Sequence, residues 1–163
     1  MLKQLIPQDF CLNCPGCCRF AKKDSPWQVY LTDREVQNFG RGQAAAGLIS
    51  AERKINLIFS AEDETFICPL LQPQNNHCRL YQSRPFDCQL YPFLLNRRGK
   101  NVFLAASPHC LYIRERLSSP EVKKYVKYLG QFFQGAAGRR FLKNNPHIIH
   151  YYPKVKNLLT LIV

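Results

Sequence analysis

The sequence Cys11-Leu12-Asn13-Cys14-Pro15-Gly16-Cys17-Cys18 places four of the chain's eight cysteines within eight residues. A thiol packs as a small hydrophobic group, so a core does not need four of them side by side. A soft metal does need several thiolates close together. The stretch therefore predicts half of a metal or iron–sulfur site. The remaining cysteines are expected to supply the other half: Cys68, Cys78, Cys88 and Cys110.

The spacing within this stretch favours an iron–sulfur cluster over zinc. Cys11, Cys14 and Cys17 form two overlapping Cys-x2-Cys turns, the arrangement with which bacterial ferredoxins hold three corners of a four-iron cluster. The fourth ligand comes from elsewhere, and Cys68-Pro69 has the Cys-Pro sequence that usually supplies it. Zinc ribbons use two separated Cys-x2-Cys pairs, and the distal cysteines contain no such pair. We therefore expect a 4Fe-4S cluster, with zinc as the alternative.

Cys17 and Cys18 are adjacent, which leaves the number of sites open. Neighbouring side chains in an extended backbone point to opposite sides, so one of the two is expected to serve a second metal or another edge of a larger cluster. Eight thiolates can hold two four-ligand sites, or one site with additional reactive or supporting thiols.

Length and composition indicate one small domain. The chain has 163 residues and 46% hydrophobic residues, and no apolar run approaches the roughly 20 residues of a membrane span. We expect an irregular α+β fold over residues 1–163. Cysteine loops and short hairpins would surround the metal site over about 10–110, and helices would pack over about 118–163.

The cysteine usage also bears on the compartment. The N-terminal residues lack the apolar stretch of a signal peptide, so a cytoplasmic location is expected. Thiols are kept reduced there, which favours metal ligation over a disulfide scaffold. Disulfides remain the second interpretation of the cysteines, although Cys17 and Cys18 cannot easily bond to each other.

The chain is strongly basic, with 23 lysines and arginines against 11 acidic residues and a formal net charge of +12. Such a surface attracts nucleic acid, anionic lipid or an acidic protein, and part of the charge can offset the thiolates. Clusters at Arg97, Arg98 and Lys100 and at Arg139, Arg140 and Lys143 allow phosphate contacts, but no nucleic-acid-reading motif accompanies them. A solvated basic surface is the favoured interpretation of most of these residues.

Regular structure is expected in short elements in the first part of the chain. Thr32-Asp33-Arg34-Glu35 matches a capping box and predicts a helix from about Asp33 to Gly40 or Gly42. A strand is expected near 53–59. The runs 66–71 and 77–81 flank turn-forming residues and predict a hairpin that brings Cys68 close to Cys78. Pro85 is expected at the first position of a short helix that contains Cys88.

The second part of the chain carries the clearest helix. Residues 119–134 have a Ser119 cap and an apolar stripe at helical spacing, and Gly135 and Gly138 are expected to end the helix. Before it, the runs 93–95 and 102–105 flank a turn. After it, Phe141 begins another short helix, and the tail 155–163 forms either a docking helix or an edge strand.

Three motifs in order resemble a known family: Cys11-x2-Cys14-x2-Cys17-Cys18-Arg19, then Phe66-Ile67-Cys68-Pro69-Leu70-Leu71, then Cys78-x-Leu80-Tyr81-x2-Arg84-Pro85-x2-Cys88-x2-Tyr91-Pro92-Phe93. This combination resembles the CxxCxxCC cysteine-cluster family, also called YkgJ-like, over roughly residues 10 to 110. The resemblance implies a zinc- or iron-chelating domain with Cys110 as the eighth cysteine. The family is similar to the cysteine-rich part of flagellin lysine N-methylase, which implies an iron–sulfur cluster and S-adenosylmethionine-dependent methyl transfer in that enzyme.

Three functions follow as hypotheses. The first is a metal-binding module that carries an iron–sulfur cluster for redox chemistry, sensing or metal handling. The second is a cluster-dependent enzyme such as an S-adenosylmethionine-using methyltransferase, although no glycine-rich nucleotide loop is present. The third is a structural zinc site in a basic interaction protein. Arg84 is expected either to donate to cluster sulfurs or offset thiolate charge, or to pair with Asp87 or cap a carbonyl, and the second, structural role is favoured. His77 and His109 are interpreted as supporting rather than ligating residues.

Overall fold

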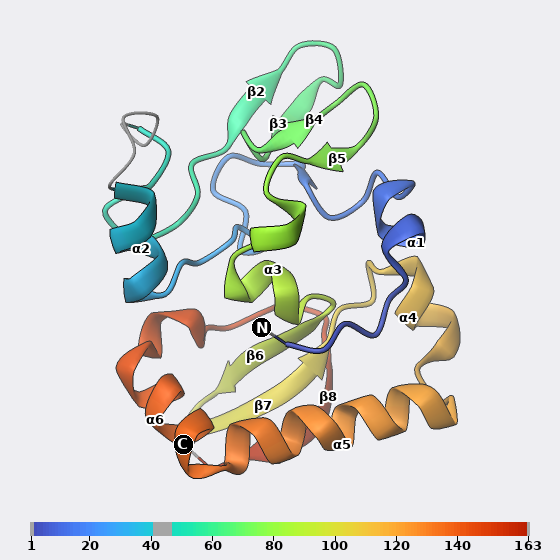
Figure 1. Cartoon of the computed structure of the whole chain (residues 1–163), viewed down its shortest axis with the longest axis vertical. Helices are drawn as coiled ribbons and strands as arrows, with labels where there is room; N and C mark the ends of the chain where they lie inside the picture. Colours follow the sequence, from blue (N-terminus) through green and yellow to red (C-terminus); the bar gives the residue numbers. More distant parts are fainter. Residues whose placement is uncertain (1, 41–46, 163) are drawn as a thin grey trace. The chain divides into compact units, whose positions relative to one another are not determined.

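The computed structural model describes residues 2–40 and 47–162, and the chain divides into two compact units, Met1–Gln89 and Leu90–Val163 (Figure 1). Helices and antiparallel sheets occur together, as the α+β prediction requires. Each unit has its own sheet and its own helices. Whether the two units form one domain stays a prediction. Among the described residues, no helix has the length and apolar character that crossing a membrane requires.

The first unit consists of short elements joined by turns and irregular backbone, as the sequence predicted. Its elements are α1 (Gln8–Leu12), β1 (Arg19–Phe20), α2 (Asp33–Gly40), β2 (Ile58–Ser60), β3 (Thr65–Ile67), β4 (Leu71–Gln72), β5 (His77–Cys78), the 3-10 helix η2 (Tyr81–Ser83) and α3 (Phe86–Leu90).

Helix α2 begins at Asp33 because the predicted capping box forms. The Glu35 carboxylate accepts hydrogen bonds from the Thr32 backbone N–H at 2.8 Å and from the Thr32 hydroxyl at 2.9 Å. The Glu35 backbone N–H in turn donates to the Thr32 hydroxyl at 3.3 Å. These contacts satisfy polar groups that the first turn of a helix otherwise leaves without partners. The predicted end at Gly40 agrees with the structure, and the alternative end at Gly42 lies outside the described residues.

Two antiparallel sheets organise the first unit, and one prediction about them needs correction. Strand β3 lies between β1 and β2, and β4 pairs separately with β5. The predicted hairpin between 66–71 and 77–81 is therefore shorter than expected, with Leu71 opposite Cys78, because Phe66 and Ile67 pair with β1 and β2 instead. The strand expected near 53–59 is confirmed only in part. It comprises β2 at 58–60 and isolated bridges at Lys54 and Ile55.

A hydrophobic core holds these strands together and includes one of the cysteines. Cys68 is 7% exposed and packs with apolar side chains of β1, β3, β4 and the connecting segments. The other buried members of this core are Phe20, Leu31, Ile55, Leu57, Ile67 and Leu71. Apolar burial at about 25 cal/mol per Å² stabilises this part without help from a metal.

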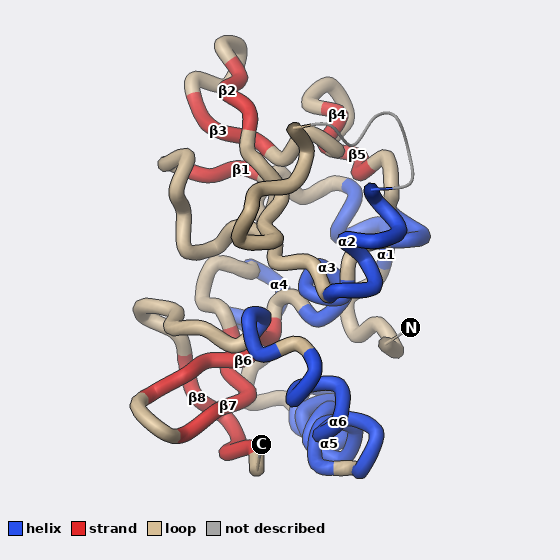
Figure 2. The backbone as a smooth tube through the Cα atoms, turned by 90° about the vertical axis from the view of Figure 1, so that its left-hand side faces the viewer, coloured by secondary structure: helices blue, strands red, loops and turns tan. Residues whose placement is uncertain are grey.

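The second unit is a three-stranded antiparallel sheet with helices (Figure 2). Its strand order is β6-β7-β8, so the tail of the chain adds an edge strand rather than a docking helix. The last part of the region expected to be helical is therefore a strand. The elements are β6 (Phe93–Arg98), β7 (Asn101–Ala106), α4 (Leu111–Arg116), α5 (Pro120–Gln134), α6 (Ala136–Asn144), the 3-10 helix η3 (Pro146–Ile148) and β8 (Lys156–Leu161).

Helix α5 matches its prediction, whereas α6 is longer than predicted. The Ser119 hydroxyl caps α5 by accepting from the Val122 N–H at 3.2 Å. Gly135 separates the two helices, but Gly138 does not break helical structure and lies inside α6. A Cβ atom at Gly138 would collide with the backbone of Phe132 and Phe133 in α5. Gly138 therefore allows the close approach of two helices, which the sequence alone does not distinguish from a helix end.

Candidate metal centre

The first cysteines of the motif lie on and just after a short helix. Cys11 is in α1, a five-residue helix in a region that was predicted to be loop. The Cys14 N–H donates to the Cys11 carbonyl at 3.3 Å, so the chain turns back between the two residues as a Cys-x2-Cys motif requires. A Cβ atom at Gly16 would lie 3.5 Å from the Cys14 sulfur, which places this backbone against the thiol.

Cys17 and Cys18 contradict the expectation that they point to opposite sides. They lie in a turn rather than in extended backbone, and their side chains are hydrogen bonded to each other. This bond, with Cys18 as the donor, is the largest factor that lowers the pKa of Cys17 to about 7. The positive charge of Arg84 acts in the same direction, and burial opposes it. The same bond, together with burial and the charge of Cys17, raises the pKa of Cys18. The two thiols therefore face one common region.

Backbone pairing brings Cys68 beside this turn. The Cys68 N–H donates to the Cys18 carbonyl at 3.0 Å, directly after the β1–β3 ladder in which Arg19 is opposite Ile67. Cys78 is opposite Leu71 in the β4–β5 hairpin, and the Leu71 N–H donates to the Cys68 carbonyl at 2.9 Å. The structure thus confirms that a chain reversal connects the Cys68 and Cys78 segments.

Cys88 is positioned by α3, and two half-buried carboxylates hold this helix. The Phe86 N–H donates to Glu35 at 2.6 Å, which connects α3 to the cap of α2. Asp87 accepts from the Tyr30 N–H at 3.1 Å. Burial, assisted by the negative charge of Glu35, raises the pKa of Asp87 to about 7 against the opposing effect of the Tyr30 N–H. Contacts at the two residues that precede Cys88 therefore hold the helix that carries it.

The electrostatic environment shows that five thiols lie within interaction range of one another. Burial raises the pKa of Cys68 to about 11, and the charges of Cys78 and Cys17 add to this rise. Burial likewise raises the pKa of Cys78 and, further, that of Cys88, with contributions from Cys17 in both cases and from Cys68 for Cys88. Charge interactions weaken with distance, so these mutual effects indicate that the thiols are neighbours. The structure therefore brings together cysteines from both halves of the sequence motif.

Arg84 supplies positive charge to this group of thiols. It lowers the pKa of Cys17 and partly offsets the rise at Cys78. Its guanidinium lies 4.0 Å from the centre of the Tyr81 ring, and Tyr81 is hydrogen bonded to Cys11. Among the described residues Arg84 forms no ion pair with Asp87, so the geometry agrees with charge compensation and not with the alternative pairing.

Cys110 lies in the second unit. It is 9% exposed and occupies the N-cap position of α4, where its carbonyl accepts from the Arg114 N–H at 2.9 Å. Its contribution to the same site stays a prediction.

The donor set fits a soft metal, although the thiols are not yet arranged around one point. Within residues 2–40 and 47–162, no three His, Cys, Asp or Glu side chains form a ready-made metal site. Ligation therefore requires some of the thiols to reorient, including Cys17 and Cys18, which are hydrogen bonded to each other. Several sulfur donors with one cation nearby suit zinc or an iron–sulfur cluster and do not suit Mg²⁺ or Ca²⁺, which prefer oxygen.

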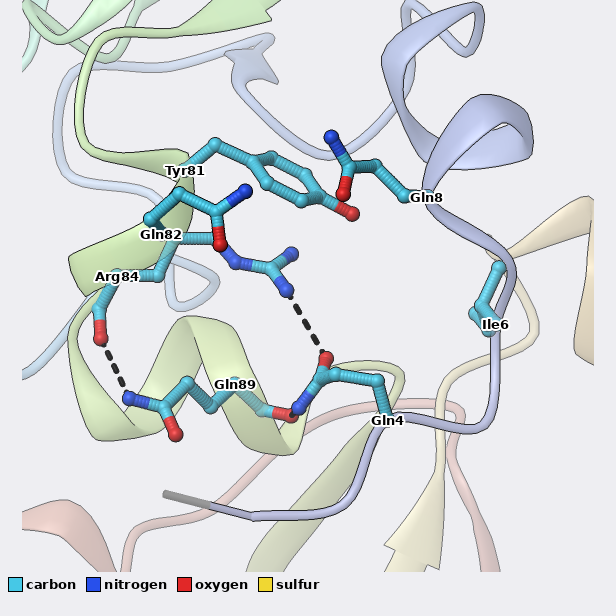
Figure 3. Close-up of a pocket in the computed structure, with 7 residues that line it drawn as sticks. All are labelled: Gln4, Ile6, Gln8, Tyr81, Gln82, Arg84 and Gln89. Atoms are coloured by element: carbon cyan, nitrogen blue, oxygen red, sulfur yellow. Dashed lines mark hydrogen bonds between the residues drawn. The ribbon is translucent and has the colours of Figure 1, made fainter.

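A pocket of about 160 Å³ lies beside Arg84 and Tyr81 (Figure 3). Arg84 donates to the Gln4 side-chain oxygen at 3.0 Å, and the Gln89 amide donates to the Arg84 carbonyl at 2.7 Å. The Arg84 Nε is buried and has no hydrogen-bond partner among the described residues. The pocket is lined by Gln4, Ile6, Gln8, Tyr81, Gln82, Arg84 and Gln89.

Three residues that support the site were not assigned this role from the sequence. Arg19 donates to the Pro15 carbonyl at 3.2 Å and to Asn76 at 2.8 Å, and its Nε lies 3.5 Å from Asp63. It therefore fastens the cysteine loop to two distant turns. Glu35 and Asp87 hold α3, as described above. Arg19 does follow Cys18 directly within the motif, and this was the available signal.

Comparison with known proteins agrees with the motif order. Residues 10–111 match the model of the CxxCxxCC family, described as "Putative zinc- or iron-chelating domain". The matched range agrees with the roughly 10 to 110 expected from the motifs. No curated protein and no solved structure matches the chain.

Proposed function

The chain belongs to the CxxCxxCC family of zinc- or iron-chelating domains, and on this premise we propose that its cysteines hold a 4Fe-4S cluster for redox chemistry, sensing or metal handling. The observation that carries the proposal is the mutual interaction of thiols from Cys17, Cys18, Cys68, Cys78 and Cys88 within one unit. Such a group of thiols, next to Cys11 and Cys14 at ferredoxin-like spacing, offers more than the four ligands that one cluster needs.

The chain's own residues have defined parts in this proposal. Cys11, Cys14 and Cys17 supply three ligands, and Cys68, in the buried core, supplies the fourth. Arg84 offsets the negative charge of the ligands, and the apolar core around Cys68 keeps water away from one side of the site. Cys18, Cys78, Cys88 and Cys110 are then available for a second site or for supporting contacts. A bound cluster would supply one-electron chemistry.

Anaerobic purification followed by an absorption spectrum and by iron, sulfide and zinc analysis tests this function. The proposal predicts a coloured protein that contains iron and acid-labile sulfide in equal amounts. A colourless protein that contains zinc and neither iron nor sulfide would instead support the structural zinc alternative. In that case, complete metal removal should unfold the chain, because the binding free energy of a structural zinc is folding free energy.

The pocket beside Arg84 favours a second candidate function, namely a cluster-dependent enzyme. Arg84 and Tyr81 line the pocket and also interact with Cys17 and Cys11, respectively. A molecule bound in the pocket would therefore be separated from these two thiols by a single side chain. The buried Arg84 Nε offers a donor to a carboxylate or another anionic group. S-adenosylmethionine, the co-substrate expected from the family resemblance, carries such a carboxylate.

Calorimetry with S-adenosylmethionine and the reconstituted protein tests the enzyme candidate. Saturable binding that weakens at least fivefold in Gln82→Ala, but not in the control Gln74→Ala on an exposed turn, would support it. An absence of binding to protein with full cluster content would contradict it without affecting the cluster proposal.

A further inference from the structure

The positive charge of the chain is concentrated in its second unit. Residues 90–163 contain thirteen lysines and arginines against two glutamates, a formal net charge of +11. Residues 1–89 contain ten against nine, a formal net charge of +1. The thiols of the proposed metal centre, apart from Cys110, lie in the nearly neutral unit. Charge compensation of thiolates therefore does not explain the basic character of the second unit.

The cations of the second unit are accessible and mostly lack carboxylate partners. All thirteen side chains belong to exposed residues. Among the described residues of this unit, only Arg116 and Glu115 form an ion pair, at 3.6 Å. Helix α5 exposes Lys123, Lys124 and Lys127, while most of its apolar stripe is buried. A surface of this kind attracts polyanions at long range.

One group of these cations includes an accessible aromatic ring. Arg97, Arg98 and Lys100 lie at the β6–β7 turn and are all exposed. The Arg98 guanidinium lies 4.4 Å from the centre of the Tyr151 ring and donates to the Tyr152 carbonyl at 3.5 Å. Tyr151 is 55% exposed, so much of this side chain stays accessible although Arg98 lies against its ring. We call Arg97, Arg98, Lys100 and Tyr151 the turn cluster.

Hydrogen bonds hold the backbone on both sides of Tyr151 in place. The Arg97 N–H donates to the His150 carbonyl at 2.9 Å, and the Tyr152 N–H donates to the Asn96 side chain at 2.9 Å. Tyr151 is therefore anchored on both sides to strand β6. An accessible aromatic ring on an anchored backbone, beside arginine and lysine side chains, is the arrangement that stacks a nucleic-acid base while cations contact the flanking phosphates.

We propose that the second unit binds single-stranded nucleic acid, with Tyr151 as the stacking surface and with Arg97, Arg98 and Lys100 as phosphate contacts. A lipid surface is the weaker match, because binding to a bilayer interface needs an apolar face beside the cations. Helix α5 buries Val122, Leu129 and Phe133, and Phe132, at 37% exposed, adds a single aromatic ring rather than such a face. The proposal does not depend on which metal the cysteines bind.

Fluorescence anisotropy with the full-length, metal-loaded protein and a labelled 12-nucleotide single strand tests the proposal. Binding is expected to weaken as salt rises, and removal of three cations in R97Q/R98Q/K100Q should weaken it by at least about tenfold and reduce the salt slope by about 2. The matched control K22Q/K23Q/R34Q removes three exposed cations from the first unit and should change affinity by less than about twofold.

The aromatic contact is tested separately. Tyr151→Ala should weaken single-strand binding by about tenfold, whereas Tyr151→Phe, which keeps the ring, should bind like the parent protein. Any of three results would overturn the proposal: no binding of the oligonucleotide at low salt, equal losses in both triple variants, or binding to vesicles of phosphatidylserine and phosphatidylcholine without binding to the oligonucleotide. Equal affinities of Tyr151→Ala and Tyr151→Phe would remove the stacking role.

Discussion

Arg84 both affects the electrostatics of the thiols and lines the adjacent pocket. Its guanidinium lies over Tyr81, donates to Gln4 and lowers the pKa of Cys17. An arginine held by neighbours in this way loses little conformational freedom when it compensates bound thiolates. Its effect should therefore be visible in metal retention more than in folding.

Arg84→Gln should lose its metal faster than the parent protein. Residues that support metal ligands without binding the metal typically contribute 10- to 100-fold to metal affinity, so the rate of iron or zinc transfer to a chelator should rise by about tenfold. Arg79→Gln removes an exposed cation next to Cys78 and is the matched control. Equal chelation rates in the two variants would show that Arg84 has no such role.

Tyr125 should make the free energy of unfolding depend on pH in the alkaline range. It is 7% exposed, its ring centre lies 5.3 Å from that of Phe93, and burial raises its pKa from 10 to about 12. Below pH 10 the hydroxyl is protonated in both the folded and the unfolded chain. Between pH 10 and 12 only the unfolded chain loses this proton, so the free energy of unfolding falls.

Tyr125→Phe should remove the contribution of Tyr125 to the decrease in the free energy of unfolding at high pH, which is on the order of 2 kcal/mol at pH 12. Urea unfolding at pH 8 and at pH 11 to 12 measures it, with the exposed Tyr151→Phe as the control. An identical pH dependence in parent and Tyr125→Phe would contradict the assignment.

At this scale the sequence predicted which residue types form the site but not their local geometry. The cysteines of both halves do meet, because the motif spacing reflects a chain that returns to the same place. The orientation of Cys17 and Cys18 was predicted wrongly, because an extended backbone was assumed where the chain turns. A turn of this kind depends on contacts from Arg19 to residues more than 40 positions away.

At the scale of elements, short helices and strands position the thiols by connecting to one another. Glu35 joins α2 to α3, since one carboxylate caps Thr32 and also accepts from the Phe86 N–H. The capping box was predictable from four residues, whereas the contact to α3 depends on the tertiary fold. Helix α3 carries Cys88, so the contact between Glu35 and Phe86 also affects the position of a cysteine of the metal centre.

Glu35→Gln should lower the free energy of unfolding by about 2 kcal/mol, because an amide cannot accept all of these hydrogen bonds. It should also lower the metal content of the purified protein, since α3 loses one of its two anchors. Glu62→Gln, which changes an exposed carboxylate, is the control for both measurements. A destabilised Glu35→Gln variant with full metal content would show that the anchoring of α3 does not affect metal binding.

Gly138→Ala tests the packing of α6 against the end of α5. Helix propensity alone favours alanine by about 1 kcal/mol. Steric overlap with the Phe132 and Phe133 backbone should reverse the sign and destabilise the protein by about 1–3 kcal/mol.

The exposed Ala137→Gly, one position earlier in α6, measures the propensity effect without the clash and should cost about 1 kcal/mol. Denaturant unfolding of both variants provides the comparison. A stabilised Gly138→Ala protein would show that the helices have room to separate.

At the scale of the whole molecule, the α+β class, the long helix α5 and the family were predictable from pattern. The division of charge was not predictable without the boundary between the two units, because the +12 total conceals units of +1 and +11. The position of β8 was also ambiguous, because a short apolar tail has no period that separates a strand from a helix. Pairing with β7 decides it.

The central claim is that the cysteines of the first unit hold a 4Fe-4S cluster. The most direct measurement is the content of iron, acid-labile sulfide and zinc per chain in anaerobically purified parent protein, Cys68→Ser and Cys110→Ser. The parent and Cys110→Ser should each contain about four iron and four sulfide, and Cys68→Ser should contain little of either. Zinc without sulfide in the parent protein, or full iron and sulfide content in Cys68→Ser, would contradict the account.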